Sequence, residues 1–332
     1  MSLTAAPARE IAPRVLLSAL AMAAGLAFLL SLSVGPAWFG FGPPSAAGSL
    51  IFWEIRMPRA VLGALTGASL GLAGAALQGY LRNPLAEPGL IGVSSGAALG
   101  AVLAIHLGLS QALALALPIG GLIGGAVAML AVVALAGVAG GPITLILAGV
   151  AVSAIATAIT SLALNLSNNP FASVEMVFWM MGSLADRSLT HVWLASPLML
   201  IGMGLLLLVG RALDALTLGE DAARSLGINV VRTRWLIIAG TALSVGAATA
   251  VTGVIGFVGL LIPHILRPFV GHKPGLLLPA SALAAATFLL VADTGLRLIQ
   301  PWVELRIGVL TALIGAPFFV WLVLKTRAEL AP

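Results

Sequence analysis

The side chains that could carry out catalysis or bind a metal are few in this chain and lie far apart. There is no cysteine, so the sequence predicts neither a disulfide nor a thiolate metal site. Lys273 and Lys325 are the only lysines, and neither follows a glycine-rich loop, which excludes an ATP-binding P-loop. The four histidines are too scattered to predict a metal cluster: His106, His191, His264 and His272. We therefore expect no catalytic site, bound cofactor or bound metal in this chain.

Asp293 is the one acidic residue within or near the interior of a long apolar segment. An intramembrane aspartyl protease needs two carboxyl groups that share a proton, and a proton-coupled carrier usually needs several buried ionisable groups. Arg297 follows Asp293 by one helical turn, so the sequence predicts a local ion pair near the end of the segment. The chain is thus expected to move a solute without powering the movement itself.

Composition places these residues in a membrane. The chain is 60% hydrophobic and 8% charged, far below the roughly one-quarter charged residues of soluble domains. Apolar segments near the bilayer-crossing length of about 20 residues recur, and we predict about ten spans. They are residues 14–34, 58–80, 91–108, 113–138, 143–166, 190–212, 233–253, 255–271, 276–299 and 306–324. The expected fold is all-α, a polytopic membrane protein with a single transmembrane domain over residues 1–332.

Glycines repeat at helical spacing within two of these segments. They recur every four residues as Gly63, Gly67 and Gly71, and again as Gly92, Gly96 and Gly100. Faces of small residues allow two helix backbones to approach closely in lipid. We expect this packing to join helices of one subunit, giving a tight bundle.

The basic residues orient the spans. Threading ten spans with the N-terminus inside places eleven of the sixteen basic residues in the cytoplasm, which is the usual positive-inside bias. Both termini are then cytoplasmic, and the first span serves as an anchor. The net charge of +5 needs no nucleic acid as a partner. The five basic residues left outside are Arg56, Arg59, Arg187, Arg297 and Arg306.

The most charged loop of the chain contains a predicted short helix at residues 219–227. Gly219 stands at the N-cap position, and Glu220 and Asp221 lie in the first turn, where the helix dipole favours acids. Glu220 and Arg224 are four residues apart, and Gly227 is placed to end the helix in a left-handed conformation. Because so short a helix is marginal in water, it is expected to pack against a cytoplasmic partner, and a solvated turn is the alternative that the residues leave open.

The segment Arg82–Gly89 cannot continue the second span as a helix. Pro84 and Pro88 lack the backbone N–H and bias the residue before each of them towards extended backbone. Irregular backbone at membrane depth is tolerated where it is buried in protein or lines a water-filled cavity.

Several stretches of sequence resemble the permease subunits of ATP-binding cassette (ABC) importers for iron chelates, haem and cobalamin. The resemblance covers residues 50–325, in the order expected for that family. The matching stretches are RMPR (Arg56–Arg59), RNPLAEPGLIGVSSGAALG (Arg82–Gly100), LGEDAARSLG (Leu218–Gly227), GVIGFVGLLIPHILRPFVG (Gly253–Gly271), LLVADTGLRL (Leu289–Leu298) and IGVLTALIGAPFFVWLVL (Ile307–Leu324).

This resemblance implies the type II ABC importer permease fold, a place in the inner membrane of a bacterium and a set of partners. A second copy of the chain would complete the translocation pathway, and two separate ATPase subunits would bind ATP and magnesium. A periplasmic binding protein would deliver the substrate, which would be a ferric siderophore, haem or cobalamin.

The resemblance also implies roles for individual residues. Residues 219–227 correspond to the family's coupling helix, which docks on the ATPase through Glu220, Asp221, Ala222, Ala223, Arg224, Leu226 and Gly227. The arginines that correspond to docking sites for the binding protein are Arg56, Arg59 and Arg297. The cytoplasmic gate would comprise Asn83, Leu85, Pro142 and Ile143. Cobalamin-transporting relatives carry small hydroxyl residues where this chain has Pro142 and Ile143, so the motif does not select cobalamin.

Two other classes of function stay open from the residues alone. An ATP-independent secondary carrier or channel would transport a small solute without partners, and an intramembrane enzyme is a more distant alternative. A requirement for an ATPase and a binding protein distinguishes the permease from both.

Overall fold

The computed structural model describes residues 12–35, 46–137, 140–299 and 305–330. Helices joined by loops make up these residues, without β-strands. Its elements are α1 (Pro13–Ser33), α2 (Ala46–Ile51), the π-helix η1 (Phe52–Arg56), α3 (Met57–Leu81), the 3₁₀ helix η2 (Pro88–Ile91), α4 (Val93–His106), α5 (Leu109–Ala112), α6 (Ala116–Ala136), α7 (Pro142–Asn165), α8 (Pro170–Met180), α9 (Leu189–Leu207), α10 (Gly210–Leu216), α11 (Glu220–Ser225), α12 (Val230–Thr252), α13 (Val258–Leu266), the 3₁₀ helix η3 (Arg267–Val270), α14 (Pro274–Ile299) and α15 (Ile307–Leu330).

Eight helices in the described part of the chain are long and apolar enough to cross a membrane. Two shorter apolar helical segments, Val93–His106 and Val258–Val270, correspond to the third and eighth predicted spans, so together the segments match the ten that the sequence predicts. Both short segments begin after a backbone interruption. Gly92, with φ of 83°, precedes α4, and Phe257, with φ of 66°, precedes α13.

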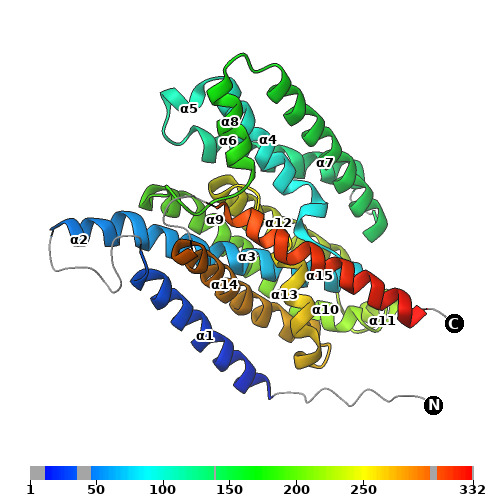
Figure 1. Cartoon of the computed structure of the whole chain (residues 1–332). Helices are drawn as coiled ribbons and strands as arrows, with labels where there is room; N and C mark the ends of the chain where they lie inside the picture. The colour runs from blue at the N-terminus through cyan, green and yellow to red at the C-terminus, as the bar shows by residue number, and fades with distance from the viewer. Residues whose placement is uncertain (1–11, 36–45, 138–139, 300–304, 331–332) are drawn as a thin grey trace.

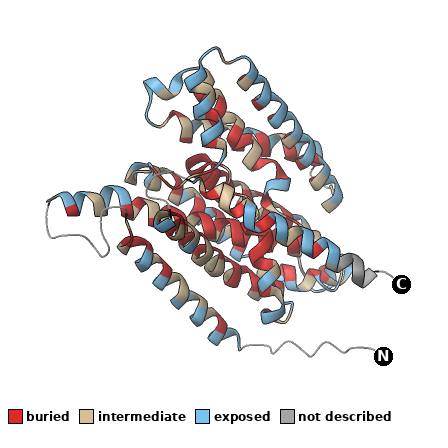
Figure 2. Ribbon diagram, viewed as in Figure 1, coloured by how far each residue is buried: buried red, intermediate tan, exposed pale blue. Residues whose placement is uncertain are grey.

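Helices α3 and α12 form the centre of the bundle. Helix α12 packs on α4 and α6 on one side and on α3 and α9 on the other, and α14 packs along α3. Figure 1 shows α4 to α8 gathered on one side of α12, with α1, α3 and α14 on the other. Buried residues concentrate on the central helices, whereas the outer surfaces of α1 and α7 are largely exposed (Figure 2).

The predicted glycine faces pack helices of the same subunit. A Cβ added at Gly67 or Gly71 would overlap a backbone carbonyl oxygen of α14. Likewise, Gly96 and Gly100 of α4 face the backbone of α6, whose own glycines Gly120 and Gly124 allow the contact. Small residues therefore set the helix spacing on both sides of the bundle.

The bundle has two ends that the length of α3 separates. Gly79, near the end of α3, lies against Leu213 of α10, the helix that leads into α11, whereas Arg59 lies in the first turn of α3. A helix of this length measures on the order of 35 Å. We call the two ends the α11 end and the Arg59 end.

Candidate functional sites at the two ends of the helical bundle

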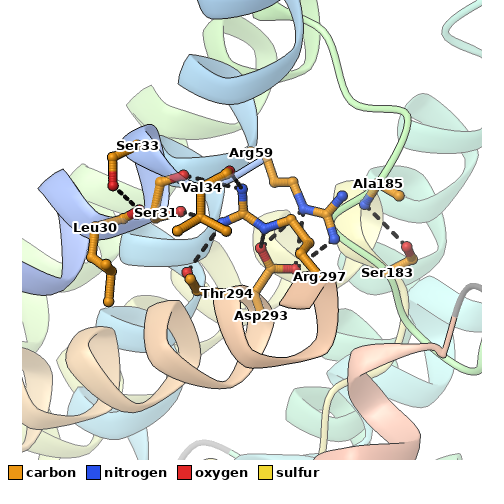
Figure 3. Close-up of polar contacts among 10 residues, drawn as sticks. All are labelled: Leu30, Ser31, Ser33, Val34, Arg59, Ser183, Ala185, Asp293, Thr294 and Arg297. Carbon is orange, nitrogen blue, oxygen red and sulfur yellow. Dashed lines mark hydrogen bonds and ion pairs between the residues drawn. The ribbon is translucent and has the colours of Figure 1, made fainter. Parts of the chain in front are cut away.

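A buried ion-pair cluster joins α3 and α14 at the Arg59 end. The Nε of Arg59 donates to both carboxylate oxygens of Asp293, at 3.1 and 2.9 Å, and its Nη2 lies 2.9 Å from Oδ1 (Figure 3). Arg297 forms the predicted ion pair one turn further along α14, with its Nε 3.2 Å from Oδ2 of Asp293. One carboxylate thus holds two guanidinium groups.

Arg56 and Arg297 bind the end of α1. Arg297 donates from Nη1 to the carbonyl oxygens of Ser31 and Val34, at 3.0 and 2.7 Å, and from Nη2 to the hydroxyl of Ser31. Arg56 donates from Nη1 to the carbonyl oxygens of Leu32 and Ser33, at 3.0 and 3.3 Å. Carbonyl groups at a helix C-terminus have no partner within the helix, so the two arginines supply the missing donors.

The three arginines that the sequence assigns to docking differ in how far they are buried. Arg56 is 3% exposed and the Arg297 side chain 8%, whereas the Arg59 side chain keeps 21% of its surface accessible. Two of the three therefore contact mainly the protein itself, and Arg59 has the most surface left for a partner. The docking role stays a prediction, now centred on Arg59.

The short helix at the α11 end has the predicted local structure. Gly219 is the N-cap of α11, Glu220 and Asp221 occupy the first turn, and Gly227 adopts φ of 82° just beyond the C-cap. Nη2 of Arg224 lies 3.5 Å from Oε2 of Glu220, with both side chains exposed. Residues 219–227 thus form a capped helix.

The faces of this helix differ from the prediction at one position. Leu218 and Leu226 are 69% and 64% exposed, and Ala222 is half-buried, so these side chains are available to a partner. Ala223 is instead fully buried in this chain, and its carbonyl oxygen accepts a bond from the N–H of Ile228. Ala223 therefore has no surface exposed to a partner in this structure, and the docking role of residues 219–227 stays a prediction.

The interruption after α3 is confirmed. Arg82 ends α3 in the left-handed conformation, with φ of 48°. The side chain of Asn83 accepts a hydrogen bond from the N–H of Leu85 at 2.9 Å, which closes a tight turn. Asn83 and Leu85 are half-buried, and η2 begins at Pro88.

The second predicted gate pair lies at the beginning of a helix rather than within a turn. Pro142 is the first residue of α7, and Ile143 is 74% exposed. Arg234 of α12 donates from Nη1 to the carbonyl oxygen of Gly140 and from Nη2 to that of Gly137, the latter at 2.8 Å. Nothing in the sequence indicated this contact.

A buried polar network, also absent from the sequence prediction, fixes the interrupted segment. Gln78 donates from Nε2 to the carbonyl oxygens of Ala86, Gly259 and Leu260, each at 3.3 Å, and its Oε1 accepts from Arg267 at 2.7 Å. Glu87 accepts a 2.5 Å bond from the N–H of Phe257 immediately before α13. Burial raises the pKa of the Glu87 carboxyl, and this hydrogen bond partly opposes the rise.

The described residues contain no group of three or more His, Asp or Glu side chains that could hold a metal ion. Their polar side chains instead bind backbone groups and one another at the two ends. Such an arrangement positions helices and loops.

Residues 16–325 match the FecCD transport family. The chain belongs to this family.

Relatives of known function agree. The cobalamin import system permease protein BtuC of Halobacterium salinarum is 41% identical over 282 residues, which cover 85% of this chain and 75% of the relative. The vitamin B12 import system permease protein BtuC of Citrobacter koseri is 40% identical over 312 residues, 94% of either chain. A solved metal-chelate type ABC transporter in an inward-facing conformation superposes with a TM-score of 0.85 at 33% identity, covering 95% of this chain and 100% of that one.

This FecCD protein is therefore a multi-pass permease subunit of an ABC importer. The predicted family, fold class and transport function are confirmed. The chain is the transport subunit and not the catalytic one, and the comparisons favour this function over the ATP-independent carrier that the sequence left open.

Proposed function

We propose that this permease imports a corrinoid of the cobalamin class. The observation that supports this substrate is the identity of 40–41% to permeases named for cobalamin or vitamin B12 import, over most of the chain. A ferric siderophore or haem is the second candidate, because the solved neighbour at 33% identity is a metal-chelate type transporter.

We further propose that two copies of the chain form the pathway and that two ATPase subunits bind the α11 end. Leu218 and Leu226 support this assignment, because large apolar side chains exposed on a short polar helix are suited to a partner's cleft. Glu220, Asp221 and Arg224 would form polar contacts around them. ATP and magnesium would bind only on the ATPase subunits.

The orientation follows from this assignment. Helix α1 ends at the Arg59 end, so it begins on the α11 side. The loop after α8 also lies at the Arg59 end, because its Leu184 packs against Gly63 near the beginning of α3. Gly308, at the beginning of α15, packs against this loop, so α15 ends on the α11 side. In Figure 1 that side is the lower right. With the α11 end in the cytoplasm of a bacterium, both termini are cytoplasmic, and Asn83, Leu85, Pro142 and Ile143 lie at the cytoplasmic gate.

At the opposite face we propose that Arg59 receives an acidic side chain of the periplasmic binding protein. Its guanidinium is preoriented by Asp293 and remains partly accessible. Replacing Arg59 with glutamine should slow association of the binding protein and reduce the salt dependence of the rate, since charges at an interface rim act mainly on encounter. Replacing the exposed Arg211 of α10, at the other end, is the control of equal charge. Unchanged association in R59Q would reject the docking role.

The substrate is tested by reconstituting the permease with its ATPase and binding protein in vesicles. Uptake of cobalamin, a ferric siderophore and haem is measured with and without ATP. The proposal predicts ATP-dependent uptake of cobalamin. Uptake of only the ferric siderophore and haem would reject cobalamin as the substrate. Uptake by the permease alone, without ATPase or binding protein, would reject the importer mechanism.

The ATPase interface is tested with Leu226→Asn. This variant should lose most ATP-dependent uptake and bind the ATPase less tightly while remaining folded, because the side chain is 64% exposed. The matched control is Leu107→Asn, since Leu107 is 67% exposed and follows α4. Equal uptake in both variants would show that α11 does not dock.

A further inference from the structure

Arg234 is a buried cation whose bonds go to a neighbouring loop. The residue lies in the second turn of α12 and is 3% exposed. Its two terminal nitrogens donate to the carbonyl oxygens of Gly137 and Gly140, on either side of the connection between α6 and α7. Hydrogen bonds from an ionised donor are about twice as strong as neutral ones, and burial keeps water from replacing them. Gly137 and Gly140 are thereby fixed to α12, just before Pro142.

The helix that carries Arg234 is joined to α11 by a short connection. Only residues 226–229 separate α11 from α12. The N–H of Ile228 donates to the carbonyl oxygen of Ala223 at 3.0 Å, and the side chain of Asn229 caps α12 by accepting from the N–H of Arg232 at 2.9 Å. Because Ala223 is also fully buried, this connection leaves little room for α11 to move independently of α12. A displacement of α11 is therefore passed to the first turns of α12.

The Asn83–Leu85 half of the predicted gate is held by another contact. The interrupted segment that follows α3 is instead fixed by Gln78 to α13. The two predicted halves of the gate are thus attached to different helices, and Arg234 binds the backbone just before the Pro142–Ile143 half.

We propose that Arg234 is the positioning residue that transmits movement of α11 to the Pro142–Ile143 half of the gate. The inference rests on the proposed function of α11 as the helix that docks on the ATPase. Arginine suits the task because its planar fork holds two carbonyl groups at once, whereas lysine has one point of attachment. Without the fork, α11 and α12 would move while the connection before α7 did not follow.

The absence of native cysteine allows a direct test. The reporter substitution is Ile143→Cys, at a side chain that is 74% exposed, and the permease that carries it is reconstituted with its ATPase. The rate of labelling by a water-soluble maleimide is measured with and without ATP, together with ATP hydrolysis and uptake. The parent, which carries I143C alone, should show an ATP-dependent change in labelling. When R234A is added, that change should shrink by about fivefold or more, the lower end of typical coupling between sites.

R234A and further variants make the test specific. R234A should keep ATP hydrolysis and lose uptake, because the ATPase still docks on α11 while the gate no longer follows. R234K should recover only part of the response. Arg232→Ala removes an exposed arginine from the same helix and should behave as the parent. Should R234A fail to assemble, R234Q, which retains a donor, replaces it in the same comparison.

The outcomes separate the two proposals. If labelling at position 143 responds to ATP equally in the parent and in R234A or R234Q, Arg234 does not transmit the movement and the inference is wrong, while the proposed function stands. If the parent itself shows neither uptake nor a response to ATP, the proposed function fails and the inference fails with it. A lost response in R232A as well as R234A would show a general effect of charge removal and would also overturn the inference.

Discussion

Replacing Asp293 with asparagine is expected to destabilise the permease strongly. Its carboxylate is 3% exposed and lies 2.9 Å from Arg59 and 3.2 Å from Arg297. Asparagine has almost the same shape and keeps one oxygen that accepts a hydrogen bond. It removes the only charge in the cluster that offsets the two guanidinium groups bound to it.

The size of the effect follows from burial. Removing one partner of a buried ion pair costs about 3–5 kcal/mol, because the remaining charge stays uncompensated in a medium that solvates it poorly. Water screens part of the Arg59 charge, since that side chain is 21% exposed, whereas Arg297 at 8% is screened far less. We therefore expect D293N to lower the free energy of unfolding by about 3 kcal/mol, the lower end of that range.

The exposed pair in α11 provides a control within the same chain. Arg224 and Glu220 are 62% and 43% exposed and lie 3.5 Å apart, and exposed pairs of this spacing contribute only about 0.3–0.5 kcal/mol. Unfolding of the purified permease in mixed micelles is followed by tryptophan fluorescence as the denaturing detergent is increased. Glu220→Gln should leave the midpoint almost unchanged, whereas D293N should shift it clearly.

A double variant separates charge from packing. In D293N/R59Q one of the uncompensated cations is removed, so the double variant should regain part of the stability lost in D293N. If D293N is as stable as E220Q, the buried cluster does not hold α3 to α14 and the reasoning is refuted. If D293N is destabilised but the second substitution adds a full further loss, packing rather than charge explains the effect.

Two further predictions concern other parts of the bundle. Because burial raises the pKa of Glu87 above its ordinary value of 4.5, the folded state holds this proton more tightly than the unfolded state, so the contribution to stability is present below pH 4.5 and lost as the pH rises through the raised pKa. Glu87→Gln, which keeps an oxygen for the N–H of Phe257, should flatten the pH dependence of the unfolding midpoint just above pH 4.5, and an unchanged slope would contradict this. A Cβ at Gly74 would overlap the carbonyl oxygen of Gly259, whereas one at Gly204 meets nothing within 4 Å. Gly74→Ala should therefore abolish the folded peak in size-exclusion chromatography while Gly204→Ala elutes as the parent does, and equal profiles would show that α3 and α13 can separate at no cost.

The features that the sequence predicted correctly depend on residues close together in the chain. The N-cap glycine, the early acids and the left-handed Gly227 describe α11 because each acts within a turn or two of its own position. The same is true of the break after Arg82 and of the pairing between Asp293 and Arg297. Periodicity and local capping rules are sufficient for such features.

The features that the sequence could not predict join residues far apart in the chain. Arg59 and Asp293 are 234 positions apart, and Arg234 and Gly137 are 97 apart. The hydrophobic pattern of a span shows that it crosses the membrane but not which neighbour it contacts, since most of its surface is apolar. The burial of Arg56 and Arg297 against the end of α1 was missed for the same reason.

The arginines at the end of α1 also have a consequence for how the protein is made. Helix α1 leaves the ribosome before α14, so the carbonyl groups of Ser31 and Val34 are made long before Arg297, which lies 266 positions beyond Ser31. Arg56 follows soon enough to bind Leu32 and Ser33 early, but until α14 arrives Ser31 and Val34 need hydrogen bonds from interfacial water, because unsatisfied carbonyl groups in lipid are costly. Insertion of α14 therefore completes the hydrogen bonding of α1, and a chain truncated before α14 lacks this donor at the end of its α1 helix.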